Sequence, residues 1–179
     1  MQTGGRMLPL SHVGFTTAAV KVLETGLRLR QIDYRIVIVS SLLPDLIDKS
    51  LFKLLESSFT YESRAIGHSL VLLGFIGILA AMQWLWNKET WLFPVFIGTL
   101  FHDVFDVMWI HPSIFYWPLE GWQFSKPIDE AWLGTIQLGW YKIKQRDLFD
   151  NISVLILLYF FMKVALGGKI FEFLRKGKL

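Results

Sequence analysis

Three long apolar stretches dominate the pattern of hydrophobic and polar positions along the chain. They cover residues 66–86, 91–110 and 152–166, and only a few polar side chains interrupt them. A helix needs about 20 apolar residues to cross the hydrocarbon core of a bilayer. The first two stretches meet that length, and the third approaches it if its lysines extend toward the membrane surface. The pattern therefore predicts three helices that cross a membrane.

Two shorter segments near the N-terminus predict two further helices. Residues 12–29 place apolar side chains at helical spacing, while Lys21 and Glu24 make the helix amphipathic. We expect this helix to pack against other helices on its apolar side. Residues 34–43 are rich in valine and isoleucine, but an isolated strand in a membrane would leave its backbone groups unpaired. They are therefore predicted to form a helix whose far end is the Pro44 region.

The rest of the chain is more polar. Residues 111–150 are rich in Trp, Pro, Gly and charged side chains, which is typical of a segment at the membrane–water interface with one or two short helices. Residues 169–179 are predicted to be a short basic tail. Because no linker or internal repeat divides the chain, we predict one domain over residues 1–179. Its expected fold is all-α, an integral membrane helical bundle of about five helices with an interfacial Trp/Pro-rich segment before the last helix.

Composition agrees with a membrane protein and narrows the chemistry. Hydrophobic residues make up 53% of the chain and charged residues only 18%, which is less charge than a water-soluble domain normally carries. The chain has no cysteine, so any metal must be held by imidazole and carboxylate groups. The net charge of +3 is spread along the sequence, without a basic run beside stacking aromatic residues. We therefore expect no nucleic-acid partner.

Several polar residues are predicted to meet at one face of the bundle. If every helix crosses the membrane, the start of each odd-numbered helix lies beside the end of each even-numbered one. This alternation brings five residues together: His12, Asp45, His68, His102 and Asp106. A histidine near a helix end, or Asp45 after Pro44, can also be a hydrogen-bonded or capping residue with no chemical role.

His102 and Asp106 are the most informative pair, because they lie inside an apolar stretch. They are four residues apart, so they share one helix face and can bind one ion. Asp103 points about 100° away from His102 and is less suited to join them. Asp106 would lie about 6 Å inside the end of its helix, where an ionised carboxylate must be paired, protonated or bound to a cation. Imidazole with carboxylate suits zinc, manganese or iron.

An early histidine and a series of short runs follow one another in a specific order. They are His12, Ser41-Leu-Leu-Pro-Asp45-Leu-Ile-Asp48, Arg64-Ala-Ile-Gly-His68-Ser69, His102-Asp-Val-Phe-Asp106, and Met108-Trp-Ile-His-Pro112 followed by Trp117-Pro-Leu-Glu-Gly-Trp122. In order and spacing these runs resemble the YdjM-like family of membrane-bound metal-dependent hydrolases, over roughly the first two-thirds of the chain. The resemblance implies a multi-spanning inner-membrane protein whose metal ligands are His12, Asp45, His68, His102 and Asp106.

Two departures from the family pattern affect the expected ligands. Many members have a histidine directly before the arginine, where this chain has Ser63. Many also place the second aspartate two residues after the first, whereas Asp48 follows Asp45 by three, so the resemblance does not extend to Asp48 as a ligand. A more distant similarity is to zinc-dependent phospholipase C and the related nucleases. Those enzymes use a further His-x-x-x-Glu pair that is missing here, which implies a reduced site with one or two metals.

Together, the polar cluster and the resemblance predict a metal-dependent hydrolase at the membrane interface. Its substrate would be a phosphoester such as a lipid headgroup or a lipid-linked phosphate. A divalent metal, zinc first with manganese or iron as alternatives, would lower the pKa of a bound water toward about 7 and polarise the phosphoryl oxygen. Asp48 or Asp103 would act as general base, and Arg64 would hold the phosphate by bidentate hydrogen bonds.

Two other functions fit the same residues. In a transporter or proton relay, Asp103, Asp106 and His102 would bind the ion that is moved. In a scaffold without chemistry, the polar cluster would only fix helix packing. The basic residues on the presumed far side, which include Arg28 and Arg30, predict by the positive-inside rule that the tail is cytoplasmic and the site extracytoplasmic.

Overall fold

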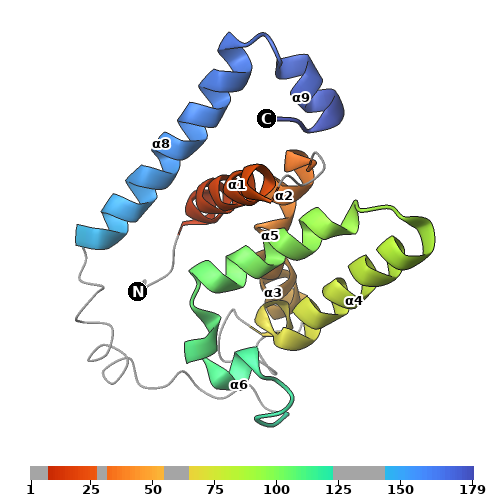
Figure 1. Cartoon of the computed structure of the whole chain (residues 1–179). Helices are drawn as coiled ribbons and strands as arrows, with labels where there is room; N and C mark the ends of the chain where they lie inside the picture. The colour runs from red at the N-terminus through yellow and green to blue at the C-terminus, as the bar shows by residue number, and fades with distance from the viewer. Residues whose placement is uncertain (1–7, 28–31, 55–64, 123–143) are drawn as a thin grey trace.

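The computed structural model describes residues 8–27, 32–54, 65–122 and 144–179, and these residues form helices and turns without a strand (Figure 1). The predicted all-α class is therefore confirmed for the part of the chain described. The α-helices are α1 (Pro9–Gly26), α2 (Tyr34–Ser40), α3 (Leu43–Leu54), α4 (Leu70–Asn87), α5 (Leu92–Phe105), α6 (Pro112–Phe115), α8 (Lys144–Leu166) and α9 (Ile170–Lys176). Two short 3-10 helices, η1 (Ile66–His68) and η2 (Met108–Ile110), precede α4 and α6.

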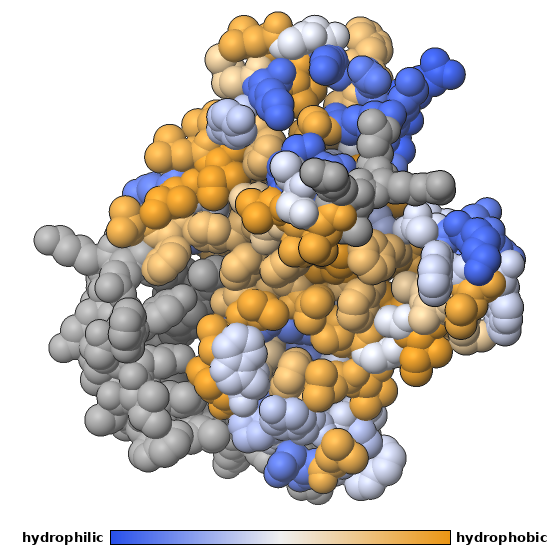
Figure 2. All heavy atoms as spheres, viewed as in Figure 1, coloured by the Kyte–Doolittle hydropathy of each residue, from blue (hydrophilic) through white to orange (hydrophobic). Residues whose placement is uncertain are grey.

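Two helices in the described ranges are long and apolar enough to cross a membrane: α4, and the Leu148–Leu166 part of α8. Only 11% of each is buried inside the protein, so most of their apolar side chains face outward, as lipid-facing residues do. Apolar residues also cover much of the face seen in Figure 2. A bundle of five membrane-crossing helices is not confirmed, because α2 has only 7 residues and α5 has 14.

Helix α5 is shorter than the apolar stretch that predicts it. The stretch runs to residue 110, but the helix ends at Phe105 and Asp106 follows as its C-cap. Val107 then adopts a left-handed conformation with a φ of 54°, which stops the helical path. The prediction that Asp106 lies a turn inside its helix is therefore wrong, and the acid lies at the helix end.

The segment from residue 34 to residue 54 also differs from the prediction. A helix was expected over residues 34–43 with Pro44 at its far end, but α2 already ends at Ser40 and Pro44 lies in the first turn of a new helix, α3. Proline lacks the N–H group that an interior helical position must donate, whereas the first turn of a helix leaves that group unused. Pro44 therefore begins a helix here and does not end one.

The C-terminal part is more helical than predicted. Helix α8 begins at Lys144, ahead of the expected start at residue 152, and α9 occupies the region expected to be a basic tail. After α9 the chain returns toward α1 and α2 (Figure 1), where the Tyr34 N–H donates a hydrogen bond of 2.8 Å to the Gly177 carbonyl. Phe173 packs against the apolar cluster formed by Val20, Ile32, Tyr34, Val37 and Ile97. The contact was not foreseen, because a charged seven-residue segment gives little helical signal alone.

Helix α5 is the central element, since it contacts α1, α2, α3 and α4. Its closest approach is to α2, at Gly98. A Cβ atom on Gly98 would lie 1.9 Å from the Ser40 hydroxyl oxygen, so only glycine fits there. That hydroxyl donates to the Pro94 carbonyl across the interface at 3.1 Å. This close approach sets the distance between His102 on α5 and the chain that follows α2.

We predict that Gly98→Ala destabilises the protein by about 1–3 kcal/mol, because the added methyl group has no room against Ser40. Gly74→Ala on α4 is the matched control, since a Cβ there meets nothing within 4 Å. The midpoint of thermal unfolding in detergent should fall for the first variant and not for the second. Equal midpoints in the two variants would contradict the close approach of α5 to α2.

Candidate metal centre

The five residues predicted to converge come from four separate segments, and the structure brings them together. His12 lies in the first turn of α1, Asp45 in the first turn of α3, and His68 ends η1. His102 lies in the last turn of α5, and Asp106 follows that helix. Their donor atoms form two overlapping groups, His12–His102–Asp106 and Asp45–His68–His102, and within each group the atoms lie within 4.8 Å of one another.

The imidazole rings of His68 and His102 form the buried middle of this cluster. Their Nε2 atoms face each other at 3.1 Å. The Nδ1 atom of His68 lies 2.6 Å from an Asp48 carboxylate oxygen, and the Nδ1 atom of His102 lies 2.6 Å from the Ser41 carbonyl oxygen. A carbonyl or an ionised carboxylate can only accept, so each Nδ1 must carry a proton. In their neutral forms, both rings then direct an Nε2 lone pair at the same point.

Two facing lone pairs repel unless something lies between them or one ring gains a proton. A doubly protonated ring could donate to the other, which would make the cluster a buried network without a metal. A cation that accepts both lone pairs also resolves the repulsion. Two nitrogen ligands at about 2.0–2.1 Å from a tetrahedral metal are about 3.3–3.4 Å apart, close to the 3.1 Å between His68 and His102. Nδ1–H groups held by a carboxylate or a carbonyl are also the usual arrangement of metal-binding histidines.

Asp106 and His12 lie on one side of the facing pair. One Asp106 oxygen is 3.3 Å from His12 Nε2, and the other is 3.7 Å from His68 Nε2 and 3.8 Å from His102 Nε2. The His12 ring stacks on the His102 ring with a centroid separation of 4.1 Å. The Asp106 carboxylate therefore reaches all three imidazoles from one position.

Asp45 also lies close to the pair. Its Oδ1 atom lies 3.7 Å from His68 Nε2, and its Oδ2 atom accepts a hydrogen bond of 2.6 Å from Lys49. Burial alone would raise the pKa of Asp45, but the hydrogen bond and the positive charge of Lys49 lower it below its ordinary value. Asp45 is therefore ionised, and it brings negative charge to the lone pairs of His68 and His102.

Asp48, which the sequence offers as a general base, lies behind His68. Its side chain is buried, and its two oxygens accept the Ala65 N–H at 2.7 Å and the Gly67 N–H at 2.6 Å as well as facing His68. A Cβ on Gly67 would lie 2.4 Å from the Pro44 carbonyl oxygen, so glycine is required for this approach. Asp48 therefore connects α3 to η1 and orients His68. This contact was not predicted from the sequence, although a glycine directly before His68 is consistent with a backbone that packs closely against another segment.

The other residues with predicted roles are not part of the cluster. Asp103 is buried next to His102 along α5, but in the described ranges it belongs to neither His/Asp group. Arg64 lies outside the described residues, so its expected role in holding a phosphate stays a prediction. The Ser41 carbonyl, which holds His102, was not predicted at all, because backbone groups leave no residue-type signal in a sequence.

An aromatic segment lies beside the cluster. Met108 of η2 and Ile114 of α6 are buried against Ala65, which immediately precedes η1. In the same segment, Trp109, Leu119 and Trp122 expose 48%, 87% and 75% of their surface. Exposed indole rings and apolar side chains are typical of the headgroup region of a membrane. The metal-binding candidates therefore adjoin a surface suited to the interface.

These features define a helical membrane protein with a buried histidine and aspartate cluster at one end of its helices. The family model described as YdjM inner membrane protein matches residues 7–170, and the chain belongs to this family. The family resemblance seen in the sequence is thereby confirmed, together with a membrane location, whereas the hydrolase activity that it implies stays a prediction. No curated protein and no solved structure matches the chain.

The two aspartates of α3 should respond differently to the same substitution. Asp48→Asn replaces a carboxylate that faces three donors with an amide whose NH₂ group has no acceptor there, so we expect a loss of about 1–3 kcal/mol of stability. Asp45→Asn removes a partly exposed ion pair with Lys49 and should cost less than about 1 kcal/mol. Thermal unfolding in detergent with excess chelator measures both without any contribution from metal. A smaller loss for Asp48→Asn than for Asp45→Asn would refute the buried role of Asp48.

Proposed function

We propose that this protein is a metal-dependent hydrolase that cleaves a phosphoester at the membrane interface. The observation that carries the proposal is the facing pair of Nε2 atoms of His68 and His102, with each ring fixed at Nδ1. His12, Asp45 and Asp106 complete the proposed ligand set. Nitrogen and oxygen donors of this kind suit zinc, with manganese or iron as alternatives.

The chain's own residues would prepare the site in three ways. Asp48 and the Ser41 carbonyl hold protons at the Nδ1 atoms of His68 and His102, which keeps both Nε2 lone pairs directed at the cation. The rings of His68 and His102 are fully buried, which excludes water from them. A divalent cation held by these residues would lower the pKa of a bound water and polarise a phosphoryl oxygen.

The general base needs a different assignment from the one that the sequence suggests. Asp48 is held by three donors, so we assign it a positioning role. Asp103 belongs to neither group of the cluster, and we assign no step to it. Asp45 directs Oδ1 at the cluster and accepts a hydrogen bond from Lys49 at Oδ2, so it stays in the ligand set and we assign the base to no residue of the described ranges.

The surroundings support a lipid or a lipid-linked phosphate as the substrate. The exposed Trp109, Leu119 and Trp122 belong to the segment whose Met108 and Ile114 pack against Ala65, next to η1, so an amphiphile in the headgroup region could reach His68 without leaving the membrane. At the other end of the bundle, the basic Arg175 and Lys176 follow the α8 span. By the positive-inside rule, this arrangement supports an extracytoplasmic metal centre in a protein that crosses the membrane more than once.

We expect the purified protein to contain zinc, manganese or iron at near-stoichiometric levels, and His102→Ala and Asp106→Ala to lose it. His102 contributes to both groups, and Asp106 reaches all three imidazoles. His111→Ala is the matched control, because His111 belongs to neither group and should leave the metal content unchanged. Elemental analysis by mass spectrometry gives the result. Normal metal content in His102→Ala would refute the proposed centre.

Turnover should depend on the same residues. Phospholipid vesicles incubated with the wild-type protein should release a phosphorylated headgroup or inorganic phosphate, and a chelator should stop the release. His102→Ala should lower the rate to background, whereas His111→Ala should not. A protein with full metal content that hydrolyses no phosphoester, in vesicles or in detergent, would overturn the proposed activity while leaving the metal centre in place.

A further inference from the structure

A second site lies at the opposite end of the α4–α5 pair from the metal centre. A cavity of about 830 Å³ opens between the end of α4, the start of α5 and the start of α2. His68 precedes α4 and His102 lies near the end of α5, whereas the lining residue of the cavity nearest to His102 along α5 is Phe96, so about 9 Å of helix lies between the two sites. A cavity of this volume is within the range that binds small organic ligands.

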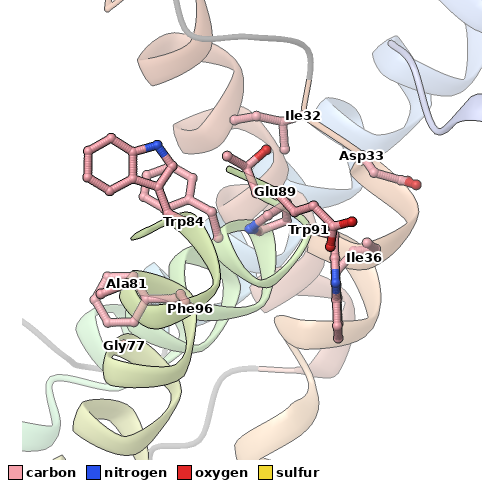
Figure 3. Close-up of a pocket in the computed structure, with 13 residues that line it drawn as sticks. Ile32, Asp33, Ile36, Gly77, Ala81, Trp84, Glu89, Trp91 and Phe96 are labelled. Carbon is pink, nitrogen blue, oxygen red and sulfur yellow. The ribbon is translucent and has the colours of Figure 1, made fainter. Parts of the chain in front are cut away.

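The cavity is apolar at one end and polar at the other (Figure 3). Gly77 and Ala81 of α4 and Phe96 of α5 form the apolar end, where the small side chains of α4 leave the space open. Asp33 and Glu89 lie toward the other end, with the indole rings of Trp84 and Trp91 (Figure 3). Because α4 is a candidate membrane span, the apolar end lies toward its middle and the polar end at the level of its terminus. This gradient matches an acyl chain below a polar headgroup.

The charges at the polar end distinguish among headgroups. Asp33 is already paired, since Arg35 donates to its two oxygens at 3.0 and 2.5 Å, and this hydrogen bonding lowers the pKa of Asp33. Glu89 is exposed, and its carboxylate accepts a hydrogen bond of 3.3 Å from the Gln83 side-chain amide. The Lys88 ammonium group lies 5.2 Å from the centre of the Trp84 ring. Glu89 therefore brings a carboxylate to the lining of the cavity, and the preceding residue, Lys88, places an ammonium group beside the lining residue Trp84.

We propose that this cavity binds a phospholipid with an ethanolamine headgroup. One acyl chain fills the space between Gly77, Ala81 and Phe96, the lipid ammonium group pairs with Glu89, and the lipid phosphate lies near Lys88. A zwitterionic headgroup complements both side chains, whereas an anionic phosphatidylglycerol headgroup would meet the Glu89 carboxylate without a cation to offer it. The site is independent of the proposed hydrolase activity, because the two lie at opposite ends of α4.

The test is lipid binding to the full-length protein in detergent, measured by native mass spectrometry with added phosphatidylethanolamine or phosphatidylglycerol. The wild-type protein should retain the ethanolamine lipid at least about tenfold better, a difference of about 1.4 kcal/mol. Gly77→Leu should abolish this binding, because its side chain enters the apolar end beside Phe96. Gly74→Leu is the matched control on the same helix, where an added Cβ meets nothing within 4 Å, and it should bind lipid as the wild type does.

Glu89→Gln provides a second variant that leaves the fold untouched, because Glu89 is exposed. It should retain acyl-chain binding but bring the ratio of the two lipids close to one. Equal retention of both lipids by the wild-type protein would overturn the proposal, and so would unchanged binding in Gly77→Leu. If a segment of this chain already fills the cavity, neither lipid will bind, which also refutes it.

Discussion

The buried carboxylate of Asp48 is the interaction on which the site depends. A buried carboxyl group is costly unless hydrogen-bond partners surround it, and here the Ala65 and Gly67 N–H groups and the His68 ring provide them. These hydrogen bonds hold η1 against α3 and fix both the position and the protonation of His68. Without them, neither the 3-10 turn nor the direction of the His68 lone pair would be determined.

His102 is also held by a neighbouring segment, in this case the end of α2. The contact of Gly98 with Ser40 brings α5 against α2, and the next residue, Ser41, then presents its carbonyl to His102 Nδ1. Two imidazoles are thus held by acceptors on opposite sides, and only their Nε2 atoms remain directed at each other. A cluster built only to fix helix packing would gain more from rings that donate to one another. The observed arrangement favours a cation as the shared partner.

The sequence predicted which residues meet but not how they are held. The alternation of helices predicted that His12, Asp45, His68, His102 and Asp106 meet at one face, and they do so although α2 is too short to cross a membrane. The positions of Asp106 and Pro44 were wrong by about one turn, since apolar runs continue past the end of a helix. The roles of Asp48 and Ser41 depend on backbone groups, which single-residue patterns do not reveal.

Helix ends explain why so many charged groups can meet in an apolar protein. Each helix carries partial positive charge at its N-terminus and partial negative charge at its C-terminus. Asp45 lies in the first turn of α3, where that positive end stabilises a carboxylate, and His102 lies in the last turn of α5, whose negative end favours positive charge. Asp106 caps α5 just beyond it and places its carboxyl group at the same end. The end of α5 is therefore suited to a cation, and it is also where the Nε2 atoms of His68 and His102 face each other.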